Sequence, residues 1–508
     1  MVLALSVLIV GYLFGPGLFA RWSIFDDHEI MSYLGSSEHL SFSQVIPKLM
    51  LTEVGSQSDL PRFRPAYYTL RLIETWAWGK HPGAWYASHL LVCLFFVWAL
   101  WSRTLGKIGV LASGLLTLYT MTLPFWPGIF AALGPGEAYA VLGLALVSIG
   151  FDRAYRDGRS RAGWLILLLG VVVAAGSKEN FLILIAPVLF LLCRGIITGT
   201  TNWIAWLSAG AAASWCVWIA AVVYGRVQQI GVDVYGNSTD AVGRLHLLLR
   251  AVRQPGIMPF YAVGALFLLL GLFLRSRRSS AARPCYAALG AMAFIVGLYL
   301  SQVVFYHGDW PTGDRNDLPG MLSWPATLFV VLWLLNRLGG LMLAGKTYRG
   351  ALLVSTLAIG AGAVVANAGN IAEIRREAEN NVHGTTAFTA EIDSLSVLAH
   401  DHPSYPVLIQ STDPADFEPL ISYPRFLVAN GVSNEMFLLW TPSRHGVSNY
   451  KGSLSAQLVG ISKGGAPGQY QPISRLTNPG DQCILVVLSG AARQPCRFQV
   501  DGSWRRFY

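Results

Sequence analysis

Long apolar stretches recur along the first 370 residues, and they constrain the fold more than any other feature of this sequence. A helix needs about 20 mainly apolar residues to cross a bilayer. Eleven stretches approach that pattern, although several are short for a full crossing. The chain is 53% hydrophobic and only 13% charged, whereas soluble domains are about a quarter charged. The sequence therefore predicts a polytopic α-helical membrane protein with about 11 transmembrane helices. The stretches are 1–20, 84–102, 108–123, 138–151, 163–175, 181–193, 203–224, 256–274, 284–306, 321–336 and 350–368.

Lys and Arg are concentrated in alternate connections between these stretches. Cytoplasmic loops of membrane proteins are enriched in both residues. The pattern therefore predicts a cytoplasmic N-terminus, an external 21–83 loop and an external C-terminus, and it explains most of the net charge of +9 without nucleic-acid binding. The basic residues of the predicted cytoplasmic connections are Arg103, Lys107, Arg153, Arg156, Arg159, Arg161, Arg194, Arg275, Arg277, Arg278, Arg283, Arg337, Lys346 and Arg349.

The composition changes near residue 370, where charges, Pro and Asn become frequent and apolar runs become short. We expect two domains, a membrane domain at 1–369 and a small extracytoplasmic α/β domain at 370–508, entered by a helix at about 373–398. Cys483 and Cys496 flank a predicted strand and turn in this external domain. Thiols oxidise readily outside the cytoplasm, so a disulfide between them is expected.

Ionisable residues gather on the predicted external face. Charged groups near membrane depth are costly, so their clustering indicates function. Each group also has an ordinary interpretation, such as a helix cap, a surface charge, a core histidine or a loop ion pair. Their shared location favours function, because carboxylates beside cations suit a phosphate-bearing substrate and a hydroxyl that must lose its proton. The residues are Asp26, Asp27, His28, Arg62, Arg64, His89, Lys178, Glu179, His307 and Arg315.

The order of these motifs resembles the C-type (GT-C) membrane glycosyltransferases. Asp26-Asp27-His28 after the first apolar stretch is similar to the acidic motif of that family. The similarity continues with Arg64-Pro65, His89-Leu90, Ser177-Lys178-Glu179 and a late external Arg315. The subgroup that this pattern resembles includes the transmembrane O-mannosyltransferases with tetratricopeptide repeats and their bacterial relatives. The 370–508 tail has no tetratricopeptide period, so the acceptor stays open.

The resemblance implies a GT-C fold in a bacterial cytoplasmic membrane and an inverting transfer on the extracytoplasmic face. The donor would be a sugar linked to polyprenyl phosphate, and the acceptor a hydroxyl of a glycan, a lipid-linked glycan or a protein. Asp27 or Asp26 would be the catalytic base, with Asp27 favoured.

The resemblance also assigns the remaining polar residues. Arg64, Lys178 and Arg315 would bind the donor phosphate, and Arg62 is the fallback for Arg64. Glu179 would orient Lys178. No cofactor is required, although His28, His89 or His307 could complete a site for Mg²⁺ or Mn²⁺, and the sequence leaves this open.

Two other classes fit part of the pattern. A lipid-linked glycan polymerase or O-antigen-ligase-like enzyme would have external Arg and His residues but needs no Asp pair after the first span. A lipid or glycan transporter usually carries charges in mid-span and often has matching halves, which this chain lacks.

The tail carries no second cluster of catalytic residues. Asp413, Asp416 and Glu418 are interpreted as solvated loop charges. Aromatic residues of the tail are expected to stack on sugars at the acceptor cleft, and the alternative is a stabilising cap that touches no substrate. The aromatic candidates are Tyr423, Trp440 and Tyr450.

Overall fold

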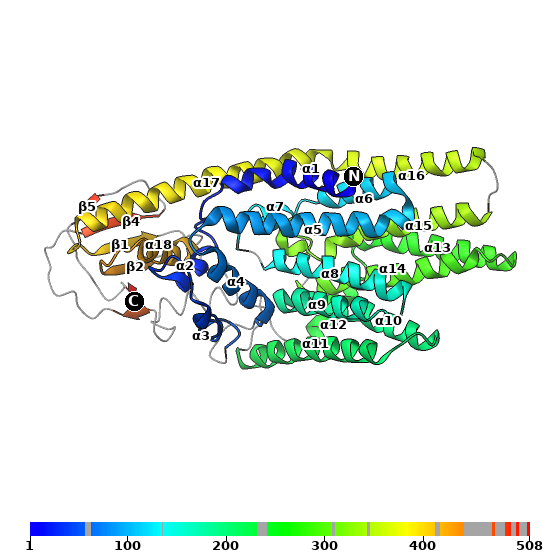
Figure 1. The fold of residues 1–508 in the computed structure, drawn as a ribbon, viewed down its shortest axis with the longest axis horizontal. Coiled ribbons are helices and arrows are strands. Elements are labelled where there is room, and N and C mark those ends of the chain that lie inside the picture. Colours follow the sequence, from blue (N-terminus) through cyan, green and yellow to red (C-terminus); the bar gives the residue numbers. More distant parts are fainter. Residues whose placement is uncertain are drawn as a thin grey trace.

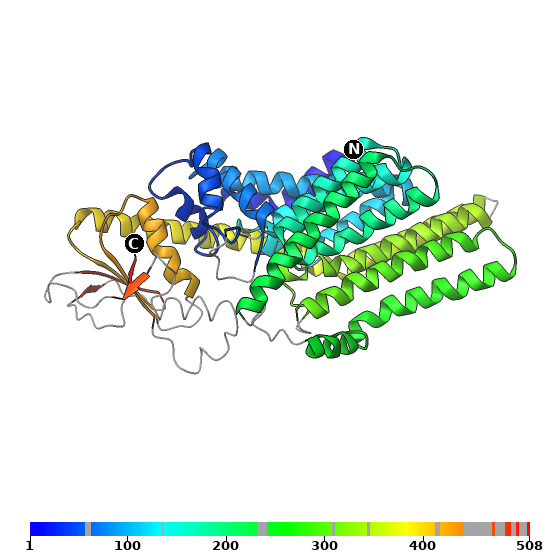
Figure 2. The same ribbon diagram turned by 90° about the horizontal axis from the view of Figure 1, so that it is seen from below.

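The computed structural model describes residues 1–55, 62–134, 136–230, 241–306, 310–342, 346–411, 417–440, 470–472, 483–488, 494–496 and 505–507. A bundle of long helices forms one end of the molecule, and a small sheet with its helices forms the other (Figure 1). The helices α2, α3 and α4, which follow α1 in the chain, lie between the bundle and the sheet (Figure 2). The first helices are α1 (Val2–Phe14), η1 (Gly15–Phe19), α2 (His28–Leu34), η2 (Phe42–Gln44), α3 (Val45–Leu49) and α4 (Pro65–Trp78).

The bundle contains the predicted apolar stretches, all of which fold as helices. Its remaining elements are α5 (Pro82–Ile108), α6 (Val110–Met121), α7 (Pro127–Phe130), α8 (Glu137–Arg156), α9 (Arg161–Ser177), η3 (Glu179–Leu184), α10 (Ile185–Ile197), α11 (Trp203–Ile230), α12 (Ala241–Ala251), η4 (Pro255–Ile257), α13 (Met258–Ser276), α14 (Ala282–Phe305), η5 (Arg315–Asp317), η6 (Gly320–Leu322), α15 (Ser323–Met342) and α16 (Lys346–Ala366).

Eight helical segments of the described chain are long and apolar enough to cross a membrane, or up to nine if a bent pair counts as one span. Of the other predicted stretches, α6 and α9 are shorter apolar helices. The bent pair joins Leu357–Ala366 to Ala368–Asp401 at an angle of 48°. The class of polytopic helical membrane protein is confirmed, whereas the count of eleven spans stays a prediction.

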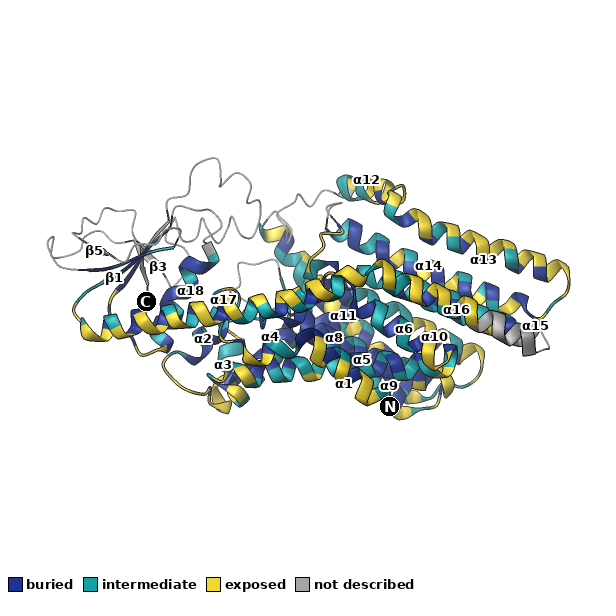
Figure 3. Ribbon diagram, turned by 90° about the horizontal axis from the view of Figure 1, so that it is seen from above, coloured by how far each residue is buried: buried dark blue, intermediate teal, exposed yellow. Residues whose placement is uncertain are grey.

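The centre of the bundle is the antiparallel pair α8 and α9, which lies in the most buried part of the molecule (Figure 3). Gly143, Gly150 and Gly170 lie where a Cβ atom would meet the backbone of the facing helix. Small residues let membrane helices approach this closely. The close packing brings the first residue of α8, Glu137, beside Lys178, which follows the last residue of α9.

The C-terminal part begins with α17 (Ala368–Asp401), a helix of 34 residues that continues from the bundle to the sheet (Figure 1). This confirms the helix expected at 373–398. The sheet has six strands in the order β3-β6-β2-β1-β4-β5. Strand β1 pairs in parallel with β2 and β4, and the other pairs are antiparallel. These elements are β1 (Val407–Ser411), α18 (Phe417–Ala429), β2 (Met436–Trp440), β3 (Tyr470–Pro472), β4 (Cys483–Val487), β5 (Gln494–Cys496) and β6 (Arg505–Phe507).

The β4–β5 ladder places the backbone of Cys483 opposite that of Cys496. Cys483 is disulfide-bonded, and Cys93, Cys193, Cys216 and Cys285 are free thiols. The side chain of Cys496 lies outside the described residues, so its pairing with Cys483 stays a prediction.

The two ends of the bundle differ in charge. The connection from α13 to α14, the end of α15 and the start of α16 lie at the end away from the sheet (Figure 1). At that same end Asp152 of α8 forms ion pairs with Arg103, Lys107 and Arg156. The predicted cytoplasmic connections are thus separated from the sheet domain by the length of the bundle. The orientation of this bundle in a membrane stays a prediction.

Candidate functional site

Asp26 lies in the segment between η1 and α2, where the backbone leaves the bundle. Its φ of 62° places it in the left-handed region, which is uncommon for a residue with a side chain. Gly134 lies so close that a Cβ atom there would occupy the space of the Asp26 side chain. Asp26 Oδ2 accepts a hydrogen bond of 2.8 Å from Arg315 Nη1, and its backbone N–H donates one of 2.6 Å to Glu418 Oε1. Three distant parts of the chain therefore fix this carboxylate.

The Asp26–Arg315 pair is the accessible part of the site. The side chains of Asp26 and Arg315 are 35% and 40% exposed. Burial raises the pKa of Asp26, but the charge and hydrogen bond of Arg315 outweigh burial and hold that pKa below its usual value. Asp26 is consequently an ionised carboxylate that solvent or a substrate can reach.

Asp27 has a different environment from its neighbour. It is completely buried, and its Oδ2 accepts a hydrogen bond of 2.7 Å from the backbone N–H of Ser23. Its Oδ1 has no hydrogen-bond partner among the described residues. Burial raises the pKa of Asp27 to about 8, against the opposing effects of the Ser23 hydrogen bond and the Arg71 charge. Near neutral pH Asp27 is therefore mainly a neutral acid, which cannot accept a proton.

His28 begins α2 and faces the C-terminal part of the chain. Its Nδ1 lies 3.0 Å from Ser422 Oγ and 3.8 Å from Glu418 Oε1. Burial, together with the charge of Arg425, lowers the pKa of His28 to about 3. The imidazole is neutral and held by Ser422, so it contributes a hydrogen bond and no charge.

Lys178 lies in the break between α9 and η3, as the sequence predicts. Its Nζ forms a buried ion pair with Glu137 and donates a 3.2 Å hydrogen bond to Asn316 Oδ1, beside Arg315. At the next residue, Glu179, the two carboxylate oxygens share one bifurcated hydrogen bond from the Arg64 Nε–H, at 3.1 and 3.0 Å. Glu179 therefore pairs with Arg64. The carboxylate that pairs with Lys178 is Glu137, whereas the sequence predicts Glu179 for this role.

Four polar residues at the site were missed by the sequence analysis. Arg71 on α4 is completely buried and donates hydrogen bonds of 2.7 and 3.2 Å to the carbonyls of Leu133 and Gly134. It fixes the loop that contacts Asp26 and leads into Glu137. A carboxylate opening an apolar stretch could have indicated Glu137. Asn316 adjoins Arg315 and bonds Lys178.

The fourth missed residue, Glu418, corrects the interpretation of a solvated loop charge. It lies on α18, bonds the backbone of Asp26, and its side chain is 33% exposed. Tyr423 on the same helix is buried edge-on against Phe388, so it is not available to stack on a sugar. Asp413, Asp416, Tyr450 and the side chain of Trp440 lie outside the described residues.

Other predicted site residues lie elsewhere. Arg62 is 4.0 Å from Glu53, and no contact with the Asp pair is found in the described residues. His89 on α5 is buried, 4.0 Å from Glu74, and neither ring nitrogen has a hydrogen-bond partner within the described chain. His307 lies outside the described residues.

A divalent cation finds no ready set of ligands in the described part of the chain. There, no group of three or more His, Cys, Asp or Glu side chains has an arrangement that could hold a metal ion. His28 instead contacts Ser422, and Asp26 binds Arg315. The candidate site consists of charged side chains paired with one another.

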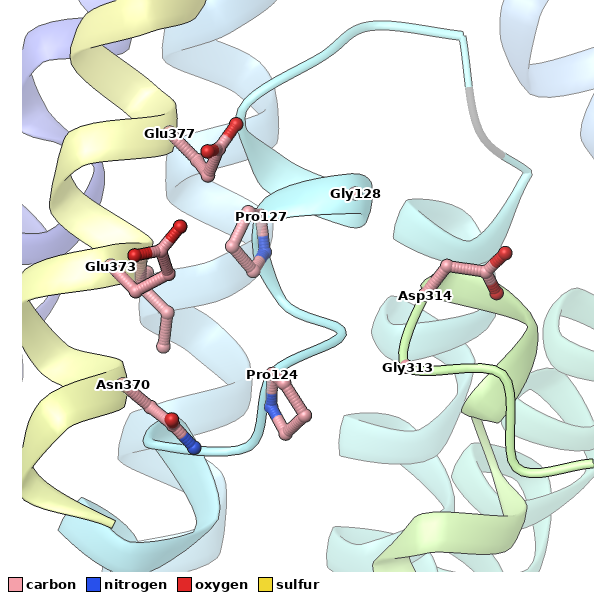
Figure 4. A pocket seen from close by; sticks show the side chains of 9 residues that line it. Pro124, Pro127, Gly128, Gly313, Asp314, Asn370, Glu373 and Glu377 are labelled. Carbon is pink, nitrogen blue, oxygen red and sulfur yellow. The ribbon is translucent and has the colours of Figure 1, made fainter.

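A cavity of about 330 Å³ adjoins the Arg315 loop (Figure 4). It lies between α17, the segment around α7, and the Gly313–Asp314 turn, and Gly128 on its wall packs against the backbone of Arg315. Its charged lining is acidic, from Asp314, Glu373 and Glu377. These carboxylates would repel an anion, whereas the cations of the cluster would attract one.

The fold and the cluster together define a multi-pass membrane protein with a charged site at one end of its helical bundle. No family model and no curated protein matches the chain. Among solved structures, it is similar to ArnT from Cupriavidus metallidurans bound to undecaprenyl phosphate, at 12% identity and a TM-score of 0.41, over 95% of this chain and 92% of that chain. The apo state of the same protein matches at 13% identity and a TM-score of 0.37, with the same coverages.

Proposed function

We propose that the protein is an inverting membrane glycosyltransferase that moves a sugar from a polyprenyl-phosphate donor to a hydroxyl acceptor on the extracytoplasmic face. The observation that carries the proposal is the accessible, ionised Asp26 paired with Arg315 at the end of an apolar bundle. A polyprenyl phosphate stays in the bilayer, so its phosphate must be met at the end of the membrane helices. A carboxylate and a cation at that level are the groups that such a transfer needs.

Asp26 is the general base of the proposed reaction. The acceptor hydroxyl gives its proton to the Asp26 carboxylate while its oxygen bonds to the anomeric carbon of the donor. The bond from that carbon to the phosphate oxygen breaks, and the electron pair leaves with the phosphate. Attack opposite the leaving group inverts the anomeric carbon. Asp27 was favoured for this role from the sequence, but its burial and raised pKa favour Asp26.

The cations of the cluster stabilise the departing phosphate. Arg315 is partly exposed and already aligned with Asp26. Lys178 is buried and donates a hydrogen bond to the side chain of Asn316, the residue that follows Arg315. Arg64 extends the cluster through Glu179. Cations placed where negative charge develops lower the barrier without reorganising during the reaction. A transporter would need no base beside these cations.

A set of lipid-linked sugars tests the proposal. The full-length protein is incubated with undecaprenyl-phosphate monosaccharides and with membranes of a deletion strain as acceptor, and release of undecaprenyl phosphate is measured. We expect release with at least one sugar, and a loss of about 100-fold or more in Asp26→Asn, as is typical when a general base is removed. Mass spectrometry of surface glycans in the deletion strain would identify the acceptor. Absence of release with every sugar, or full activity of Asp26→Asn, would overturn the proposal.

A further inference from the structure

The helix α18 of the C-terminal part packs directly on α2 of the external segment. Ser422 Oγ donates a hydrogen bond of 2.6 Å to the carbonyl of Ile24 and lies 3.0 Å from His28 Nδ1. These contacts bracket the Asp26–Asp27 pair on both sides. The sheet domain is therefore attached to the segment that holds the candidate base.

Glu418 on α18 contacts the proposed general base, Asp26. Its Oε1 accepts the 2.6 Å hydrogen bond from the Asp26 backbone N–H. Asp26 has a left-handed backbone, which L-residues rarely adopt without local hydrogen bonding to support it. A hydrogen bond from an N–H to an ionised carboxylate is shorter and stronger than one between neutral groups. An ionised Glu418 thus stabilises the conformation that turns the Asp26 side chain toward Arg315.

We infer that the C-terminal domain completes the catalytic site, with Glu418 as a positioning residue that holds the Asp26 backbone so that the Asp26 carboxylate meets Arg315 and the acceptor hydroxyl. This inference rests on the proposed function and deepens it, because it assigns the sheet domain a part in catalysis. It also replaces the alternative of a cap without contact to the site.

The charges around Glu418 make its ionisation conditional. Asp26 and Glu29 face it with negative charge, whereas Arg315 faces it with positive charge. His28 lies 3.8 Å away and is neutral, because burial and the charge of Arg425 lower its pKa. Burial, followed by the Asp26 charge, raises the pKa of Glu418 to about 7. As the pH falls below this value, Glu418 gains a proton and its bond to the Asp26 N–H weakens.

The test compares Glu418→Gln, Glu418→Ala and the control Asp401→Asn, all in the full-length protein. Asp401 is exposed at the end of α17, outside the site. Release of undecaprenyl phosphate from the active undecaprenyl-phosphate monosaccharide is measured from about pH 5 to about pH 9, with kcat and KM for the donor separated. At pH 8 we expect kcat to fall about tenfold in Glu418→Gln and further in Glu418→Ala, with KM changed less than about twofold, because donor-binding cations are untouched.

The pH profile separates positioning from a merely structural role. Wild-type kcat should decline as the pH falls through about 7, the pKa of Glu418, and Glu418→Gln should lack this decline, since its amide does not titrate. The Gln variant is isosteric, and a monodisperse elution profile verifies that it folds. The inference is overturned if Glu418→Gln keeps the wild-type kcat and the same decline, or if Asp401→Asn loses as much activity. Either result would overturn the role of Glu418 without affecting the proposed function. The proposed function fails if Asp26→Asn is fully active.

Discussion

Two adjacent aspartates between η1 and α2 differ in protonation state, and this difference separates their proposed roles. Asp26 is ionised and accessible, whereas Asp27 is buried with one carboxylate oxygen unpaired among the described residues. A buried carboxyl group that stays protonated acts as a polar packing group. Under the proposed function, Asp26 rather than Asp27 is therefore the general base.

Asp27→Asn is expected to keep at least about a tenth of wild-type activity, because an amide replaces a group that is already neutral near pH 7. Release of undecaprenyl phosphate by the purified variant measures this. The matched control is Asp26→Asn, which makes the same Asp-to-Asn replacement at the neighbouring residue and should be inactive. A loss of about 100-fold in Asp27→Asn would return the role of base to Asp27.

Asp27→Asn is also expected to change how the stability of the protein depends on pH. The pKa of Asp27 is 3.8 in an ordinary environment and about 8 in the fold. Between pH 3.8 and about pH 8, Asp27 keeps its proton in the native state and loses it in the unfolded chain. The contribution of Asp27 to the free energy of unfolding is therefore complete below pH 3.8 and is lost as the pH rises to about 8. Asn does not titrate. The Tm of Asp27→Asn relative to wild type should therefore increase between about pH 5 and about pH 8, as measured by thermal unfolding in detergent. An unchanged difference would mean that Asp27 is ionised in the fold.

Gly134→Ala tests the contact that limits the Asp26 side chain. A Cβ atom at position 134 would overlap Asp26, whose own position is fixed by Arg315 and Glu418. Displacement of a catalytic group by about 1 Å can reduce the rate about 100-fold. We expect a loss of that order in kcat with the protein still folded. Gly384→Ala, on α17 with open space around its Cβ position, should retain full activity.

At the scale of elements, the helices could be predicted from the sequence because apolar runs are local signals. The first-span aspartates, Lys178 and Arg315 could also be found, since each interrupts or borders such a run. Glu418 and Arg71 could not, because each acts through partners remote in sequence. The hydrogen bond from Asp26 to Glu418 spans 392 residues, and a charge near the start of a short amphipathic helix is usually solvated.

Asp152 connects the far ends of α5 and α8. Its buried carboxylate lies 3.5, 3.1 and 2.9 Å from the cationic groups of Arg103, Lys107 and Arg156. Asp152→Asn leaves these cations facing one another, although their partial exposure lets solvent screen the repulsion. We expect a loss of about 2 kcal/mol in the free energy of unfolding, measured as a lower Tm. The nearby exposed Asp157→Asn should change stability by less than about 0.5 kcal/mol; equal effects would rule out a special role for Asp152.

At the scale of the whole molecule, the charged ends predict orientation. Ser280→Cys, between α13 and α14, and Asp401→Cys, beside the sheet domain, place thiols at opposite ends of the molecule. Both are made in a Cys193→Ser background, because Cys193 is an exposed free thiol. By the positive-inside rule, a membrane-impermeant maleimide should label position 401 in cells with a permeable outer layer, and position 280 only after membrane disruption. The reverse pattern would invert the predicted topology.

The distance in sequence between Asp26 and Glu418 has a consequence for biogenesis. Asp26 leaves the ribosome early, whereas Glu418 follows after another 392 residues. Translation adds about 5–20 residues per second, so about 20 to 80 s pass between the synthesis of Asp26 and that of Glu418. Under the proposed function, a nascent chain that has not yet reached Glu418 therefore lacks the residue that we infer positions the general base.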